Sequence, residues 1–236
     1  MILNDFFKAL AQINDSAFKR VLFLGLGLTV ALLVGIYAGW LWLIETFADG
    51  PFVLPFVGEI TWIGNLAGWG GLALILLMSV FLMIPVASAI TSFFLEDVAD
   101  AVEAKHYPLL MPAPKVPFVD AVRDTIMFFG VLVGANLLAF FAYAMVPFLA
   151  VPIFFALNGY LLGREYFTIA AMRREGRAGA RAMYRKNTAE IWMAGLLMAV
   201  PLTIPLLNLF VPILGAATFT HLYHRISARN GAIGTR

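Results

Sequence analysis

Four stretches of this chain contain no aspartate, glutamate, lysine or arginine, and they constrain its fold more than any motif does. More than half of the 236 residues lie in these stretches, which are Val21–Ile44, Ile60–Leu95, Thr125–Gly163 and Ile191–Thr220. About 20 apolar residues already form a helix that crosses the roughly 30 Å hydrocarbon core of a bilayer. A water-soluble domain cannot bury so much uninterrupted apolar chain, so the pattern predicts an all-α integral membrane protein.

Composition supports this prediction and excludes some chemistry. Hydrophobic residues make up 62% of the chain and charged residues 13%, and the mean hydropathy is +0.89. Such values are far from those of soluble globular domains. There is no cysteine, which excludes disulfides and thiolate metal sites. The first apolar stretch follows Lys19 and Arg20 and lacks a small-residue cleavage site, so we expect it to remain as a membrane anchor in a single membrane domain.

Residues 1–14 have the periodicity of an amphipathic helix. The apolar residues recur at spacings of three and four, and the polar ones fill the remaining positions. The predicted apolar face is Ile2, Leu3, Phe6, Phe7, Leu10 and Ile13, and the opposite face is Asn4, Asp5, Lys8, Ala11 and Gln12. We expect this helix to lie in the membrane interface. The alternative is a helix that packs on a soluble core.

Two long spanning helices are predicted next, over residues 17–47 and 60–105. Between them, residues 45–59 carry three acidic residues, no basic residue and two prolines, which indicates an irregular loop. Pro85 is expected to kink the second helix, which leaves the membrane as the amphipathic stretch Glu96–Lys105. A linker with four prolines between Pro108 and Pro117 then acts as a hinge within the domain.

The last two apolar stretches are each divided by prolines, which predicts two helical hairpins over residues 118–175 and 187–226. Their turns contain no charge and almost no polar side chain. Because a turn exposed on the far side of a membrane is normally polar, we predict re-entrant, hemi-penetrating hairpins, whose backbone must be buried in protein or line a watery cavity. Two hairpins that cross the membrane completely are the alternative.

The charges indicate the topology. If only residues 45–59 lie on the outer side, all 16 lysines and arginines face the cytoplasm, as the positive-inside rule requires. Residues 164–186 carry seven of these basic groups. They are read either as a solvated cytoplasmic loop or as a contact for anionic lipid, and nucleic acid is not an expected partner.

Motifs for catalysis are absent, so no enzyme, cofactor or metal site is predicted. His221 and His224 have the i,i+3 spacing of a metal pair, but a helix-end pair stabilised by the dipole is favoured. The apolar stretches also lack the ionisable residues of proton relays, which favours a passive pathway. Its candidate pore residues are Asn136, Asn158 and Asn208, with Asn65, Thr91 and Thr203 as further polar groups.

The start of the first spanning helix is the best candidate binding site. Asn14-Asp15-Ser16 supplies N-cap residues, and the backbone N–H groups of Ala17 and Phe18 are expected to be open first-turn donors. The helix dipole favours an anion at this position, and Lys19 and Arg20 add two positive charges. This combination suits an oxyanion such as sulfate.

Several segments resemble the CysZ-type sulfate permease family of bacterial inner membranes. The most specific is Ile204-Pro205-Leu206-Leu207-Asn208-Leu209-Phe210, and it is followed by Gly215-Ala216-Ala217-Thr218. Ala99–Lys105 and the helix start Ala17–Arg20 are similar in pattern. The resemblance covers nearly the whole chain, although Phe93-Phe94-Leu95 stands where the family has a Pro-Phe-Asn type of motif.

This resemblance implies sulfate uptake for cysteine biosynthesis by a multi-pass protein of the inner membrane. It also implies assembly as a homo-oligomer, a hexamer, in contact with membrane lipids. The family's sulfate site is a helix start with two adjacent arginines, which corresponds to Lys19 and Arg20 with the backbone at Ala17 and Phe18. Two other functions stay open: a membrane scaffold or regulator that acts through residues 164–186, and an enzyme that acts on lipid.

Overall fold

The computed structural model describes residues 2–48, 52–54, 58–60, 70, 94–114 and 118–234, and these residues are mostly helical. The helices are α1 (Ile2–Ala11), α2 (Ser16–Ala48), α4 (Leu95–His106), α5 (Phe118–Met145), α6 (Ala150–Lys186), α7 (Thr188–Ala199), α8 (Pro205–Asn208) and α9 (Val211–Gly234). Two short 3₁₀ turns, η1 (Pro147–Leu149) and η2 (Pro201–Thr203), and two strands, β1 (Phe52–Leu54) and β2 (Gly58–Ile60), complete the described elements.

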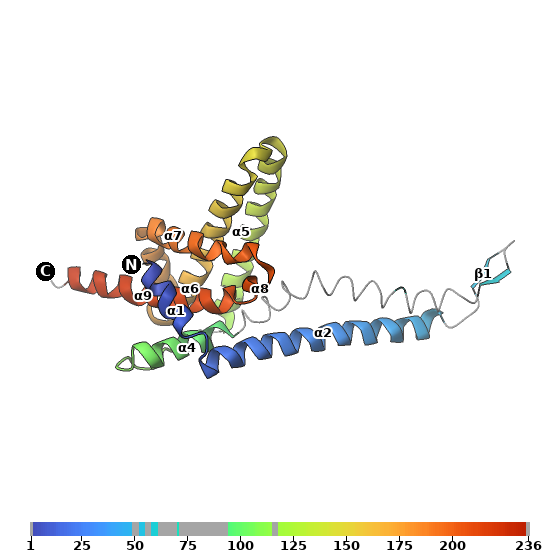
Figure 1. The fold of residues 1–236 in the computed structure, drawn as a ribbon, viewed down its shortest axis with the longest axis horizontal. Coiled ribbons are helices and arrows are strands. Elements are labelled where there is room, and N and C mark those ends of the chain that lie inside the picture. The colour runs from blue at the N-terminus through green and yellow to red at the C-terminus, as the bar shows by residue number, and fades with distance from the viewer. Residues whose placement is uncertain are drawn as a thin grey trace.

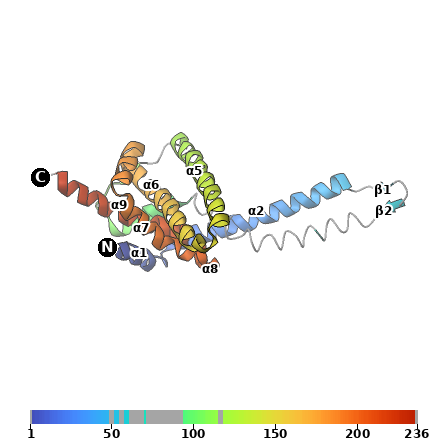
Figure 2. The same cartoon turned by 90° about the horizontal axis from the view of Figure 1, so that it is seen from above.

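Helix α2 runs away from a compact group formed by the other helices, and the α5–α6 pair rises from that group in a different direction (Figure 1). The view from above shows the same arrangement (Figure 2). Within the described residues, two helical stretches are long and apolar enough to cross a membrane. They are Ser16–Trp40, with a hydropathy of 2.4, and Pro147–Lys186, with 1.3. The first of them covers most of the predicted spanning helix 17–47, and the whole predicted range is helical in α2.

Only the last part of the predicted spanning helix 60–105 falls within the described residues. Its amphipathic end is helix α4, as expected, whereas Asn65, Pro85 and Thr91 lie outside the described residues. The prediction of an irregular loop over residues 45–59 was wrong in part. Helix α2 continues to Ala48, and β1 pairs antiparallel with β2, with Val53 opposite Glu59. Aromatic and β-branched residues in these two segments favour extended backbone.

Prolines divide the two helical pairs where the sequence predicted. Val146, which precedes Pro147, has a non-helical backbone (φ −137°, ψ 70°), so α5 ends at Met145 and α6 begins after η1. Prolines also begin η2 and α8 between α7 and α9. The structure thus has helices on both sides of each proline-containing segment. The depth to which they enter a membrane remains a prediction.

The helical pairs extend further than predicted. Helix α6 continues beyond residue 175 to Lys186, with one non-helical residue at Gly176 (φ 65°, ψ −179°). This left-handed backbone conformation is accessible to glycine at little cost, which explains why the chain can change direction there. Helix α9 continues beyond residue 226 to Gly234.

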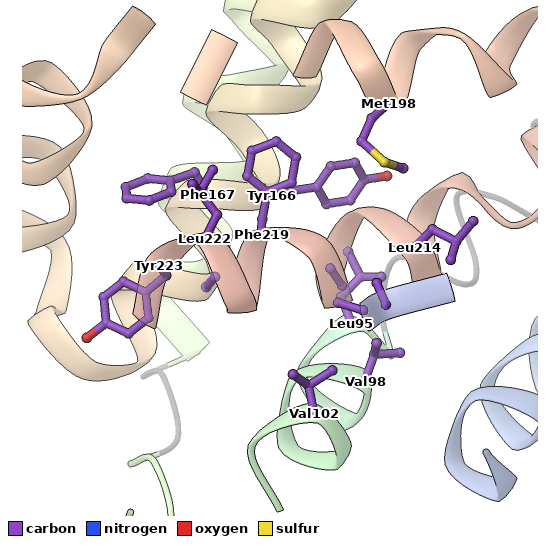
Figure 3. Packing of buried hydrophobic residues seen from close by; sticks show 14 of the residues in the cluster. Leu95, Val98, Val102, Tyr166, Phe167, Met198, Leu214, Phe219, Leu222 and Tyr223 are labelled. Atoms are coloured by element: carbon purple, nitrogen blue, oxygen red, sulfur yellow. The ribbon is translucent and has the colours of Figure 1, made fainter. Parts of the chain in front are cut away.

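Helix α9 is the centre of the core. Every residue from Val211 to Tyr223 is buried, because α1, α4, α6 and α7 pack around this helix. Figure 3 shows α9 side chains between those of α4 and α6, and the rings of Tyr166 and Phe219 stack with centroids 6.0 Å apart. These helices thus share one packed core, with Val98 and Val102 of α4 fully buried.

Helices α6 and α7 approach so closely that glycine is required at their crossing. A Cβ atom on Gly195 would lie 1.9 Å from the carbonyl oxygen of Gly159. A Cβ atom on Gly163 would lie 2.7 Å from the carbonyl oxygen of Ile191. The two backbones are therefore in direct contact, as in the small-residue crossings of membrane helices.

Helix α1 is amphipathic, but its two faces are not those predicted. Asp5 and Gln12, which were assigned to the polar outer face, are only 4% and 1% exposed. Asp5 is buried against α9, where Arg225 donates to it, and Gln12 donates to the carbonyl of Ala101 on α4. Leu3 and Phe7 remain more than half exposed. The helix packs on a protein core formed by α9, as in the second alternative. Its apolar outer side is available for the interface, a placement that stays a prediction.

Candidate functional site

The start of α2 is capped by Asp15. Its Oδ1 atom accepts a hydrogen bond of 3.1 Å from the N–H of Ala17. The sequence had predicted that this N–H is an open donor, and this detail was wrong, because the aspartate side chain folds back on its own helix as N-cap residues do. The same hydrogen bond is the main reason that the pKa of Asp15 lies below its ordinary value, so the cap is ionised at neutral pH.

Lys19 and Arg20 are both exposed, whereas Phe18 and Val21 are each 1% exposed. The two apolar side chains fix the first turn of α2 on the helical core. The two cations therefore point away from that core, which leaves them accessible to an anion from solution. Of the four predicted site residues, Lys19 and Arg20 thus have exposed side chains. The backbone N–H of Ala17 is used by the helix cap.

A third cation lies close to this helix start. Nζ of Lys105, at the end of α4, is 3.7 Å from Oδ2 of Asp15. Nε2 of Gln12 also approaches Oδ2 at 3.4 Å and donates to the carbonyl of Ala101 at 3.1 Å. Asp15 thereby joins α1, α2 and α4, and its carboxylate occupies a position where positive charge converges.

The three predicted pore residues lie on three different elements, α5, α6 and α8. Nδ2 of Asn136 donates to the carbonyl of Leu132 at 2.8 Å, and Nδ2 of Asn158 donates to that of Phe154 at 2.9 Å. These are hydrogen bonds within one helix turn. In the described part of the chain no hydrogen bond joins Asn136, Asn158 and Asn208 to one another.

The structure also contains a buried charge network that the sequence did not predict. Glu103 of α4 accepts two hydrogen bonds from Arg174 of α6, at 2.9 and 2.7 Å, and one from His224 of α9, at 2.9 Å. Arg173, which is 4% exposed, lies 3.6 Å from Glu103 and also forms an ion pair with Asp100. The network therefore joins α4, α6 and α9.

Burial alone would raise the pKa of Glu103. Hydrogen bonds from His224 and Arg174 and the charges of Arg173 and Arg174 outweigh it and lower this pKa to about 2. Glu103 is thus ionised at any physiological pH.

A second group of ion pairs holds α1 and α7 to α9. Nε of Arg225 donates to Asp5 at 2.9 Å, and the same guanidinium pairs with Glu190. Arg229 also contacts Glu190, at 2.9 Å. The charges on Asp5 and Glu190 are therefore neutralised by ion pairs between helices of the same chain.

These pairs correct the description of residues 164–186 as a solvated loop. The segment is helical on both sides of Gly176, and its Arg173 and Arg174 are committed to α4. The only sign of this network in the sequence is the spacing of three or four residues between acidic residues on α4. The partners of Glu103, Arg174 and His224, lie 71 and 121 residues away in the chain, and no local pattern identifies them.

The histidines are not a helix-end pair, because α9 continues ten residues past His224 to Gly234. The ring of His221 is 1% exposed, and its Nδ1 atom lies 3.0 Å from the hydroxyl of Tyr107. Among the described residues, no group of three or more histidine, aspartate or glutamate side chains is arranged to hold a metal ion.

Comparison with known families relates the chain to a transporter family. The model of a family described as "Sulfate transporter CysZ/Etoposide-induced protein 2.4" matches residues 5–212. The matched region begins in α1, includes the start of α2 and the α4 and α6 residues of the buried charge network, and ends at the start of α9, before His224. None of the curated proteins matches the sequence.

Proposed function

The chain belongs to the sulfate transporter CysZ/Etoposide-induced protein 2.4 family, and from this premise we propose that it passes sulfate across the bacterial inner membrane. It would act as a channel-like permease and supply sulfate for cysteine biosynthesis. The family match over residues 5–212 is the observation that carries the proposal. The two apolar helices long enough to span a membrane support it, and the absence of charge from the four apolar stretches favours passive flow.

Anion capture is proposed at the start of α2, by Lys19, Arg20 and the first-turn backbone at Ala17 and Phe18. Sulfate carries two negative charges, so it requires both positive potential and hydrogen-bond donors when it leaves water. The exposure of the two cations supports this role. Capture at Ala17 requires Asp15 to release the N–H that it now occupies, and Lys105, 3.7 Å away, can retain the displaced carboxylate.

The pathway is proposed to run along re-entrant hairpins formed by α5–α6 and α7–α9, with Asn136, Asn158 and Asn208 as pore residues. The exposed apolar side chains of the hairpins, among them Leu138, Phe148 and Leu206, support contact with lipid or with further subunits. A homo-oligomer, a hexamer as the resemblance implies, would provide the lining that a single chain lacks.

Sulfate flux into proteoliposomes tests the function and the site together. We expect the wild type to conduct sulfate, and Lys19→Ala with Arg20→Ala to weaken binding at least tenfold, since a hydrogen bond to a charged group contributes about 1.5–3 kcal/mol. Lys19→Arg should retain or improve binding, because arginine offers a planar fork of donors.

The matched control removes two other exposed positive charges, through Arg181→Ala with Arg185→Ala on α6. Arg173 and Arg174 are unsuitable as controls because they are ion-paired with α4. Equal losses in the two double variants would mean a general electrostatic effect. Absence of sulfate flux in the wild type would favour the scaffold alternative, which the pairing of Arg173 and Arg174 already makes less attractive.

Topology is tested by cysteines introduced into this cysteine-free chain. Asp49→Cys should react with an impermeant reagent from the outer side, and Pro112→Cys and Arg181→Cys only from the cytoplasmic side. Phe148→Cys, in η1, should resist the reagent from outside. Strong outer labelling at Phe148 would show that the α5–α6 pair crosses completely, and mixed labelling at every site would indicate subunits inserted in both orientations.

A further inference from the structure

All three histidines of the chain meet at one junction between α4 and α9. The rings of His106 and His221 are in edge contact, with centroids 4.7 Å apart. The hydroxyl of Tyr107 lies 3.0 Å from Nδ1 of His221, and the ring of Tyr107 lies over His224 with centroids 4.1 Å apart. The last turn of α4 thus attaches to α9 through side chains that change charge between neutral and acidic pH.

Among the described residues, this junction has no free counter-charge for a second cation. Glu103, the carboxylate that contacts His224, is already paired with Arg173 and Arg174. No described carboxylate forms a hydrogen bond with the ring of His106 or His221, and Nε2 of His221 is buried without a partner in the described chain. A proton added to His221 would therefore place an unpaired charge in the core, which is costly.

The other charged groups around the junction reinforce this effect. Lys8 of α1 and Lys105 of α4 repel a charge on His106, and Lys8 and His224 repel one on His221. Several other charged groups on the packed elements are paired with one another: Asp5 on α1, Asp100 and Glu103 on α4, Arg173 and Arg174 on α6, Glu190 on α7, and Arg225 on α9. Glu96 and Asp97 on α4 are exposed, and Glu175 on α6 accepts a hydrogen bond from Tyr223 of α9.

We propose that the His106–Tyr107–His221 junction is an acid-sensitive latch, which holds α4 on α9 at neutral pH and releases it when the histidines are protonated. The release relieves the repulsion between the two imidazolium rings and returns both to water. In the sequence, helix α4 begins at Leu95, the last residue of the apolar stretch Ile60–Leu95. The proposal concerns the packing of α4 and does not depend on which solute is transported.

The direction of the pH effect follows from the pKa values. Burial, with the charges of His106, Lys8 and His224, lowers the pKa of His221 from 6.5 to about 3, and burial likewise lowers that of His106. The docked state thus binds fewer protons than the released state. Its stability is complete above pH 6.5 and falls as the pH drops from 6.5 towards 3. Between pH 7.5 and 5.0, His221 alone should reduce the docked-to-released ratio about 30-fold.

Hydrogen exchange on the full chain in lipid nanodiscs measures this ratio directly, because amide protection reports the fraction of time that a helix is open. After correction for the intrinsic rate at each pH, protection of α4 should fall about 30-fold or more between pH 7.5 and 5.0. Helix α7, which is held to α9 by the Arg225–Glu190 pair, provides the internal reference. Equal protection of α4 at the two pH values would overturn the proposal.

Three variants separate the histidines from other acid effects. His106→Gln with His221→Phe should abolish most of the pH dependence, and an unchanged fall in that variant would also overturn the proposal. If the double variant does not fold, His106→Gln alone should give a smaller fall than the wild type. His224→Gln keeps a donor for Glu103 and should leave the decrease in α4 protection between pH 7.5 and 5.0 unchanged. If the decrease disappears in this variant, His224 is the group responsible and the assignment to His106 and His221 is refuted.

Discussion

Replacement of Glu103 by glutamine is the most demanding test of the buried network. Glu103→Gln keeps the shape of the side chain and removes its charge. Arg174 then loses the carboxylate that binds it at 2.9 and 2.7 Å, and Arg173 keeps only Asp100. Removal of one partner from a buried ion pair typically costs about 3–5 kcal/mol, because the other charge stays buried.

The pKa of Glu103 gives an independent estimate of the same quantity. A shift from 4.5 to about 2 corresponds to about 3 kcal/mol of stability at neutral pH, since one pKa unit is about 1.4 kcal/mol. The folded pKa is lowered, so this stability is complete above pH 4.5 and is lost as the pH falls from 4.5 towards 2. Glu103 is only 6% exposed, so solvent screens its interactions little and the pKa shift can be converted without a large reduction. Both routes therefore give about 3 kcal/mol.

Thermal unfolding of the purified protein in one detergent measures the effect. For a chain of this size, about 3 kcal/mol corresponds to a decrease in Tm of roughly 6–12 °C. Glu96→Gln is the matched control, since Glu96 lies on the same helix and is exposed, and its Tm should change by little. If Glu103→Gln unfolds at the temperature of the wild type, the network contributes no net stability and the reasoning is refuted.

Three further substitutions have defined outcomes. Gly195→Ala should lower stability by about 1–3 kcal/mol in the same unfolding assay, because its Cβ meets the Gly159 carbonyl at 1.9 Å, whereas Gly130→Ala in open space should not. Gly176→Ala should also lower the Tm, since φ is 65° there. Asp15→Asn keeps the helix cap and removes a negative charge, so sulfate should bind more tightly by about 1 kcal/mol or more, roughly fivefold, as measured by calorimetry. Weaker sulfate binding in this variant would show that Asp15 is not part of the proposed site.

The helices and their ends could be predicted because their causes are local. Apolar runs indicated the long helices, and prolines such as Pro147 and Pro201 indicated where they stop. Asp15 could likewise be recognised as part of a cap, although the sequence did not show that its carboxylate takes the N–H of Ala17. That hydrogen bond depends on the rotamer of one side chain, which periodicity does not determine.

The contacts between helices could not be predicted for a different reason. The faces of α1 were assigned on polarity alone, but Asp5 is buried because Arg225 lies opposite it, 220 residues further along the chain. Glu103 and His224 are similarly brought together only by the packing of α4 on α9. Such pairs depend on three-dimensional arrangement, and one sequence without that arrangement contains no signal for them.

The glycine crossing of α6 and α7 has a mechanical consequence. Where two backbones touch at Gly159 and Gly195, neither helix can slide or roll past the other without driving a carbonyl into its neighbour. The two proposed hairpins share this crossing, since α6 belongs to one and α7 to the other. We therefore expect the two proposed hairpins to move together, so that a displacement of one is transmitted to the other through this backbone contact.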